Sequence, residues 1–393
     1  MIVAMALING FKDEITNKIF DFWGHIIVTD TEINNSFIPT PIDTTDGNWK
    51  ELFKTTRDDV ASFNENPSLF SIPGSGEDPV FKSVQSFIAF PGILKTKGEF
   101  EGITVKGIGG DFNQAFFEKY IVTGEALSYD KDSIGRNLML SVQTASRLNV
   151  AVGESMDIYF IKDGNQVIRR FKIKALYKTG LEEYDKKIAF ADVRVLQQIL
   201  GWKESEVGGM ELYLHDISQM DPALNYLFDD FLPVRLFPVT IKERFPSIFE
   251  WLQLQDYNKV IIIVLMIAVC IFNLITTSLI LILERTNMVG MLKTLGMKNR
   301  SIRFIFVGFG MKILFYSLLI GNLTGLGICW LQATFKFIKL NEADYYLAYA
   351  PISIDWWGVL LLNILIVISI FISIILPTYL VQSISPLKAI KIR

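Results

Sequence analysis

Hydrophobic residues are unevenly distributed along this chain of 393 residues. After Tyr257 they gather into three long runs with almost no charge, whereas the preceding stretch alternates short apolar and polar segments. A helix needs roughly 20 apolar residues to cross the hydrocarbon core of a bilayer, and each run is long enough. We therefore predict three membrane-spanning helices, at residues 257–283, 304–331 and 356–382, rather than buried helices of a soluble core.

Residues 20–256 have the pattern of a mixed α+β domain. Apolar–polar alternation predicts short strands, and Asp163-Gly164-Asn165 predicts a tight hairpin turn between the last two of them. Segments with helical periodicity lie between the strands. The expected strands cover residues 25–29, 84–89, 103–107, 156–161 and 167–173, and the expected helices cover residues 110–119, 141–148 and 193–200.

Basic residues indicate which side of the membrane each loop occupies. Lysines and arginines are concentrated in the loop at 284–303 and in the tail at 383–393, whereas the loop at 332–355 balances its two lysines with acidic residues. Cytoplasmic loops carry the excess of positive charge. The first loop and the tail are therefore expected in the cytoplasm, and the α+β domain is expected on the opposite side.

The N-terminal residues pose a topological problem, because a translocated domain needs a hydrophobic segment before it. Residues 1–8 are apolar but lack a basic flank and are too short for a signal peptide. We interpret residues 1–19 as the end of a first transmembrane helix and its exit, with most of that helix missing from this sequence. A short, disordered apolar leader is the alternative.

A short amphipathic helix is predicted at residues 286–296, inside the basic loop. Thr286 or Asn287 is expected to cap its start, and Gly296 suits the left-handed residue after its end. Its apolar stripe, too short to form a core, is expected to lie on lipid headgroups or in a groove of a partner protein. The stripe consists of Met288, Met291, Leu292 and Leu295.

Small residues in the second span predict close helix packing. Gly321 and Gly325 have the spacing that lets two helices approach each other closely. Pro377 is expected to kink the last span near its cytoplasmic end. Lys312 interrupts the second span, and either faces protein or extends its ammonium group toward the membrane surface.

Composition argues against several classes of function. The net charge of −3, without a basic face, does not indicate a nucleic-acid-binding protein. Both cysteines lie in apolar runs, and the two histidines, His25 and His215, are far apart, which favours packing or surface roles over a metal site.

Enzyme and cofactor motifs are also missing from the sequence. The glycine-rich segments at residues 71–81 and 107–112 lack the following Lys-Ser/Thr of a phosphate-binding loop. The acidic cluster Glu182, Glu183 and Asp185 lacks the spacing of a calcium loop and is interpreted as a solvated loop. We predict a non-catalytic chain that binds no cofactor or metal itself.

Several segments resemble a known family. The sequence FNLITTSLILILERTNMVGMLKTLGMKNRSIRFIF at residues 272–306 and the closing segment at 377–393 resemble FtsX-like ABC permeases. YYLAYAPISIDWWGVLL at residues 345–361 is similar to the lipoprotein-releasing LolC/LolE branch of that family. Residues 7–26, 137–161 and 177–202 resemble the first-span exit and the periplasmic domain of the same branch.

The resemblance implies an α-helical membrane protein of the MacB/LolCE-like architecture with a large α+β periplasmic domain, in the inner membrane of a Gram-negative bacterium. Two permeases, identical or different, would pair with a cytoplasmic ATPase dimer that binds ATP and Mg²⁺, and would extract lipoproteins for a periplasmic carrier. By match of position, the residues that contact the ATPase would be Glu284, Arg285, Met288, Gly290, Met291, Leu292, Leu295 and Gly296.

One segment departs from the family pattern. The carrier-recruiting member of the family uses an extended hook between two strands, but residues 161–170 have the pattern of a tight hairpin. We expect no hook here, so that the chain matches the lipoprotein-binding partner or a system that docks its carrier differently. The alternative functions are an FtsX-like regulator of cell-wall hydrolases, which has a much smaller external domain, and a MacB-like efflux permease, which carries its ATPase on the same chain.

Overall fold

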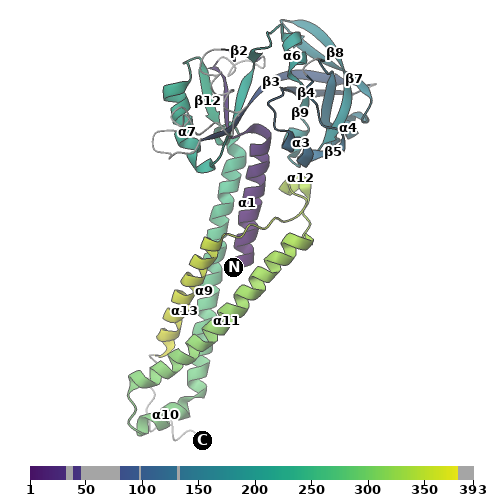
Figure 1. Cartoon of the computed structure of the whole chain (residues 1–393). Helices are drawn as coiled ribbons and strands as arrows, with labels where there is room; N and C mark the ends of the chain where they lie inside the picture. Colours follow the sequence, from purple (N-terminus) through teal and green to yellow (C-terminus); the bar gives the residue numbers. More distant parts are fainter. Residues whose placement is uncertain (32–38, 46–79, 97–98, 131–132, 379–393) are drawn as a thin grey trace. The chain divides into compact units, whose positions relative to one another are not determined.

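The computed structural model describes residues 1–31, 39–45, 80–96, 99–130 and 133–378, and Figure 1 labels many of the elements along the chain. The chain divides into two compact units. The helical unit comprises Met1–Glu14, Ser247–Leu340 and Ala348–Arg393, and the α+β unit comprises Ile15–Pro246 and Asn341–Leu347. The predicted combination of a large α+β domain with apolar helices is therefore confirmed.

The helical unit is built mainly from long helices. Within the described residues, three helical stretches are long and apolar enough to cross a membrane: Pro246–Glu284, Asn299–Phe335 and Trp356–Ile375. Where spans begin and end in a bilayer stays a prediction. The helices that contribute to this unit are α1 (Ile2–Trp23), α9 (Pro246–Glu284), α10 (Thr286–Thr294), α11 (Asn299–Phe335) and α13 (Trp356–Thr378).

Two threonines of α9 are satisfied within the helix itself. The hydroxyls of Thr276 and Thr277 donate to the carbonyl oxygens of Phe272 and Asn273, at 2.9 and 2.8 Å. Bonds to the preceding turn let a threonine sit in an apolar environment without a second partner. α1 begins at Ile2, so its first residues are helical and not the unstructured leader considered from the sequence.

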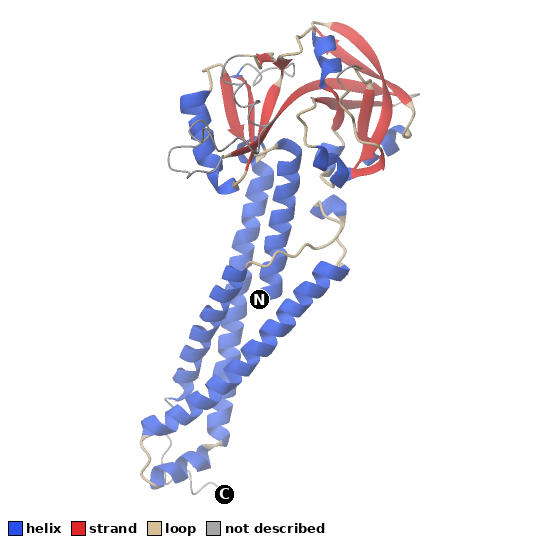
Figure 2. Ribbon diagram, in the orientation of Figure 1, coloured by secondary structure: helices blue, strands red, loops and turns tan. Residues whose placement is uncertain are grey.

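The α+β unit is built on one mixed sheet, drawn in red in Figure 2. Its described strands follow the order β12-β1-β11-β3-β4-β9-β6-β8-β5, and β7 pairs with both β3 and β8. The strands of this sheet are β1 (Ile26–Asp30), β3 (Phe81–Lys95), β4 (Phe100–Ile108), β5 (Ile121–Gly124), β6 (Asn137–Ser141), β7 (Ser155–Lys162), β8 (Asn165–Tyr177), β9 (Ile188–Asp192), β11 (Gly209–Leu214) and β12 (Leu236–Thr240). A separate pair is formed by β2 (Ile42–Asp43) and β10 (Glu206–Val207).

Short helices accompany the strands of this unit. They are α3 (Gln114–Tyr120), α4 (Val142–Leu148), α5 (Glu182–Asp185), α6 (Val193–Leu200), α7 (Met220–Tyr226), α8 (Ile241–Arg244) and α12 (Glu342–Tyr345), with single turns at η3 (Ile217–Gln219) and η4 (Leu227–Phe231). α6 has the bounds predicted from the sequence, because Asp192 accepts a hydrogen bond from the Arg194 amide at its start and Gly201 takes a left-handed conformation at its end. The predicted helix at residues 110–119 begins later, at Gln114.

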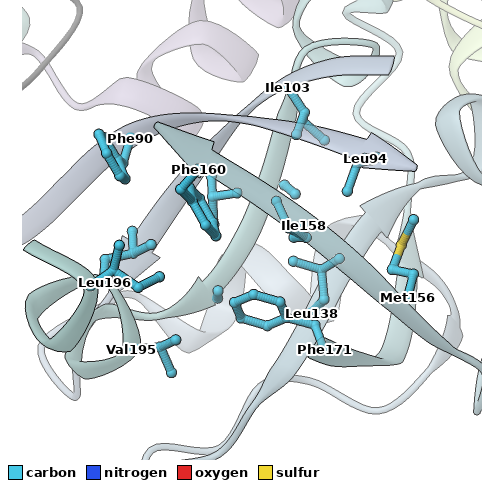
Figure 3. Close-up of a cluster of buried hydrophobic side chains, with 14 of the residues drawn as sticks. Phe90, Leu94, Ile103, Leu138, Met156, Ile158, Phe160, Phe171, Val195 and Leu196 are labelled. Carbon is cyan, nitrogen blue, oxygen red and sulfur yellow. The ribbon is translucent and has the colours of Figure 1, made fainter. Parts of the chain in front are cut away.

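The main core lies where α6 covers the sheet, and Figure 3 shows part of it. Phe90 of β3 and Phe160 of β7 stack with centroids 5.4 Å apart and planes 3° from parallel. Gly107 of β4 lets α6 approach closely, because a Cβ atom there would lie 2.9 Å from Leu196 Cδ1 and Val193 Cα. The second glycine-rich segment of the sequence therefore has a packing role at this position.

A buried ion pair fixes the end of α1 to the sheet. Lys106 of β4 and Glu211 of β11 are both 1% exposed, and the Lys106 ammonium donates to Glu211 Oε1 at 2.6 Å and to the Phe22 carbonyl oxygen at 2.9 Å. Burial lowers the pKa of Lys106 and raises that of Glu211, while their mutual attraction opposes both shifts. Five aromatic rings surround the ammonium group, from Phe22, Trp23, Phe87, Phe112 and Phe190.

The acidic cluster after β8 is not the solvated loop that the sequence suggested. Asp185 is fully buried and accepts hydrogen bonds from the Thr179 amide, the Thr179 hydroxyl and the Gly180 amide. Its carboxylate closes the turn that leads from β8 into α5. Glu182 pairs with Lys186 one helical turn later, as an ordinary surface pair does.

The two histidines have different surroundings. His25 is buried between Phe20 and Tyr213, and its Nδ1 accepts a hydrogen bond from the Leu214 amide at 2.9 Å. Burial, with a smaller contribution from Lys82, lowers the pKa of His25 to about 4, against an opposing effect of Asp21. His215 is exposed. The predicted packing and surface roles are both present.

We predict that Lys106→Met destabilises the α+β unit by about 3–5 kcal/mol, because it leaves the Glu211 carboxylate buried without its partner. Urea unfolding of the detergent-solubilised chain, followed by tryptophan fluorescence, measures the change. The matched control is Lys119→Met, which removes an exposed pair with Asp21 and should cost less than about 1 kcal/mol. Equal destabilisation by the two variants would contradict the role of the buried pair.

We also predict that the α+β unit loses stability as the pH falls from about 6.5 to about 4. The folded state binds the His25 proton less readily than the unfolded state, so the stability present above pH 6.5 decreases by up to about 1.4 kcal/mol per pH unit. His25→Asn keeps an acceptor for the Leu214 amide but cannot titrate, and should flatten the slope. The control variant His215→Asn should keep the wild-type pH dependence of stability. If His25→Asn also kept that dependence, groups other than His25 would be responsible for it.

Candidate functional site

The connection between α9 and α11 forms the short helix that the sequence predicted. Gly296, with a φ of +83°, ends α10 in the left-handed conformation, and the amides of Gly296 and Met297 bond to the carbonyl oxygens of Lys293 and Leu292. These two hydrogen bonds satisfy carbonyl groups that would otherwise lack a partner at the end of a helix. The predicted stop at Gly296 is therefore present.

The start of α10 differs from the prediction. Neither Thr286 nor Asn287 caps it; Arg285 takes that position and makes no capping bond through its side chain. α9 ends at Glu284, only one residue earlier, so no extended residue precedes α10 as side-chain capping requires. The Thr286 hydroxyl donates to the Leu283 carbonyl oxygen instead.

One face of α10 packs against the chain's own helices. Val289 is fully buried and clusters with Ile282 of α9 and with Ile302 and Phe306 of α11. Met288 and Leu292 are half-buried against the same cluster. We expected the whole stripe to contact lipid or a partner protein. For Met288 and Leu292 this is wrong, because the neighbouring helices α9 and α11 form a small core with them.

The other face of α10 remains open. Met291 is 57% exposed and Leu295 is 83% exposed. Glu284 and Arg285 are exposed before the helix, and Gly296 is exposed after it, whereas Gly290 is buried. The predicted contact residues therefore divide into a buried set that holds α10 in place and an exposed set that can meet a partner.

Charge surrounds the exposed apolar residues. Lys298 and Arg300 lie exposed just after α10, and Arg285 lies exposed before it. An apolar pair with a basic surround is suited to a groove with an acidic rim on another protein, or to anionic lipid headgroups.

The predicted packing glycines behave differently from each other. A Cβ atom on Gly325 would lie 3.5 Å from Ile2 of α1, whereas Gly321 has open space around it. The sequence analysis did not identify Gly310 as a packing glycine, although a Cβ atom there would lie 2.7 Å from Ile374 of α13. Pro377 lies inside α13.

Two asparagines add a polar contact between α11 and α13. The Asn322 amide donates to Asn363 Oδ1 at 3.0 Å, and the Asn363 amide donates back to Asn322 Oδ1 at 3.2 Å. Sequence reasoning overlooked this pair, although a lone asparagine in each of two apolar runs is a recognisable signal.

The described part of the chain shows no candidate metal site. Within residues 1–31, 39–45, 80–96, 99–130 and 133–378, no group of three histidine, cysteine, aspartate or glutamate residues is placed to hold a metal ion. The glycine-rich segment at 71–81 lies mostly outside the described residues. The exposed apolar face of α10, with its basic surround, is therefore the candidate functional site.

Comparison with known proteins agrees with the segments singled out in the sequence. Residues 260–386 match the family described as FtsX-like permease C-terminal. The lipoprotein-releasing system transmembrane protein LolC of Neisseria meningitidis is 25% identical over 418 aligned residues, covering 100% of this chain and 90% of that protein. LolE of Haemophilus influenzae is 21% identical over 377 residues, covering 92% and 83%. The predicted resemblance is confirmed.

Two solved structures are also similar to the chain. The periplasmic region of MacB from Actinobacillus actinomycetemcomitans is 11% identical with a TM-score of 0.35, covering 57% of this chain and 91% of that one. The extracellular domain of the transporter YknZ from Gram-positive bacteria is 14% identical with a TM-score of 0.30, covering 55% and 99%.

Proposed function

We propose that this chain is the permease subunit of an ABC transporter that extracts lipoproteins from the inner membrane of a Gram-negative bacterium for sorting to the outer membrane. The observation that carries the proposal is the exposed pair Met291 and Leu295 on a helix anchored by its opposite face, inside the segment that matches the permease family. The likeness to LolC over the whole chain supports the choice of lipoproteins as cargo.

In this proposal the α+β unit lies in the periplasm and α10 lies in the cytoplasm. The basic loop around α10 supports that orientation, because cytoplasmic loops carry the excess of lysine and arginine. α9, α11 and α13 each cross the membrane.

Coupling to ATP hydrolysis passes through α10. A separate cytoplasmic ATPase dimer binds ATP and Mg²⁺ and receives Met291 and Leu295 in a groove. Because Val289 joins α10 to α9 and α11 through one cluster, a displacement of α10 moves both helices together. Motion then reaches the α+β units of two paired permeases, which are identical or different chains.

The β7–β8 connection bears on the periplasmic partner. Lys162 pairs directly with Asn165, and the two turn residues between them, Asp163 and Gly164, have φ values of +48° and +76°. Two positive φ values fit the tightest hairpin turn, which leaves no room for an extended hook. We therefore propose that the carrier does not dock through a hook on this chain, and that the second permease or another surface receives it.

Two other functions remain as alternatives. An FtsX-like regulator would use its external domain to activate a cell-wall hydrolase, and a MacB-like permease would drive efflux. The identity of the proteins and lipids that bind the chain distinguishes them from lipoprotein extraction.

We predict that the tagged chain, purified from native membranes in mild detergent, brings with it an ABC ATPase and acylated lipoproteins. Mass spectrometry identifies both. Recovery of an ATPase with a wall hydrolase and no lipoprotein would favour the regulator, and purification without any ATPase would contradict the permease assignment.

We further predict that Leu295→Asp reduces recovery of the ATPase at least tenfold while the chain still folds and inserts, because this side chain is almost fully exposed. The matched control is Val234→Asp in the α+β unit, another exposed apolar position, which should leave ATPase recovery unchanged. Val289→Asp should instead disrupt the local packing of α10. Wild-type ATPase recovery with Leu295→Asp would exclude this face as the contact.

A further inference from the structure

The connection between α11 and α13 is shared between the two units. Its middle, Asn341–Leu347, belongs to the α+β unit, whereas the residues on both sides belong to the helical unit. We call this middle segment the tip and the flanking residues 336–340 and 348–355 the base. The tip contains the short helix α12.

The base is closed by its own backbone. The Leu340 amide donates to the Ala348 carbonyl oxygen at 3.0 Å, and the Ala350 amide donates to the Ile338 carbonyl oxygen at 3.0 Å. Lys339 and Tyr349 form a bridge between these bonds. The two sides of the base therefore move together.

A buried glutamine anchors the base to α11. Gln332 is 1% exposed; its amide nitrogen donates to the Ala350 carbonyl oxygen at 2.9 Å, and its Oε1 accepts from the Ile338 amide at 3.0 Å. One side chain thereby satisfies a backbone group on each side of the base, and leaving such groups unpaired when buried would be costly.

The base is also in backbone contact with α1. The Ser353 amide donates to the Ala6 carbonyl oxygen at 3.1 Å. A Cβ atom on Gly10 would lie 2.6 Å from the Pro351 carbonyl oxygen and 2.7 Å from the Ser353 amide nitrogen, so only glycine allows this approach. Within the helical unit, the base is thus fixed to α11 and to α1.

The tip is held inside the α+β unit by charge and by backbone. Glu342 of α12 forms an ion pair with Lys178 at the end of β8. The Lys18 ammonium of α1 donates to the Tyr346 carbonyl oxygen at 3.0 Å. Leu347, the last residue of the tip, is buried.

The turn after β8 is shaped to receive the tip. Gly180 has a φ of +84°, and a Cβ atom there would lie 3.0 Å from both Lys18 Nζ and the Tyr346 carbonyl oxygen. The Asp185 carboxylate stabilises this turn by accepting hydrogen bonds from the Thr179 and Gly180 amides. Burial raises the pKa of Asp185, and its hydrogen bonds and Lys18 oppose that shift.

We propose that the tip is a strap that ties α11 and α13 to the α+β unit, and so adds a mechanical connection to the covalent ones through α1 and α9. This inference rests on the proposed function, in which motion of α10 is passed to the α+β unit. α11 has 37 residues, a rigid span of roughly 55 Å, between the cluster at α10 and the base of the strap. The ion pair Lys178–Glu342 positions the tip and takes no part in any chemical step.

Amide hydrogen exchange of the full chain in lipid nanodiscs tests the docking without an ATPase or a cargo. Glu342→Lys places two cations together and should speed exchange of the Tyr345 and Tyr346 amides about threefold to tenfold, as expected for loss of a partly exposed pair. Lys178→Glu should do the same, and the double variant Lys178→Glu/Glu342→Lys should restore protection. The matched control, Glu118→Lys at an exposed position of α3, should leave these amides unchanged.

Gly180→Ala tests the same contact from the other side, because its new Cβ atom would displace Lys18 or Tyr346. It should also speed exchange at the tip. Unchanged exchange in both Glu342→Lys and Gly180→Ala, or a double charge variant that stays unprotected, would overturn the docking.

Coupling is then measured in the complex with its ATPase. Glu342→Lys should lower ATP-driven release of lipoprotein at least fivefold while ATP hydrolysis and subunit association persist, and the charge swap should restore release. Normal release by a chain whose tip exchanges freely would overturn the strap as a coupling element. Failure to recover any ATPase would count against the proposed function alone, because the exchange result does not depend on it.

Discussion

An ammonium group removed from water holds the end of α1 against the sheet of the α+β unit. Lys106 satisfies its charge with Glu211 and with the Phe22 carbonyl oxygen, and aromatic rings fill the remaining space. Because an unpaired charge in this position would be costly, α1 cannot turn or withdraw at Phe22 without disrupting the pair. The last turn of α1 is therefore part of the domain core, and the helix and the sheet behave as one body at this point.

The sequence predicted those elements that carry their own local signals. α6 has a capping aspartate and a terminal glycine, and the β7–β8 hairpin has turn residues that tolerate positive φ. β6, β9 and β11 were missed because they are buried along nearly their whole length, and a short apolar run without alternation does not distinguish strand from helix. The prediction of a solvated loop was wrong for Asp185, because the burial of a residue depends on which distant segments pack over it.

The candidate site shows the same division. Periodicity found the apolar stripe of α10, but only the positions of α9 and α11 decide that Val289 faces inward while Leu295 stays open. Likewise, two glycines at helix spacing do not show by themselves that a Cβ atom on Gly325 would contact Ile2, whereas one on Gly321 would contact no described residue within 4 Å. Local pattern thus locates a surface, whereas the neighbouring elements determine which part of it remains available.

The reciprocal amide pair between Asn322 and Asn363 has a consequence for how α11 and α13 can move. A slide of one residue along either axis shifts one amide by about 1.5 Å relative to the other. Such a slide would strain both hydrogen bonds at once. The pair therefore fixes the axial register of the two helices, and favours tilting as a joined rod over slipping past each other.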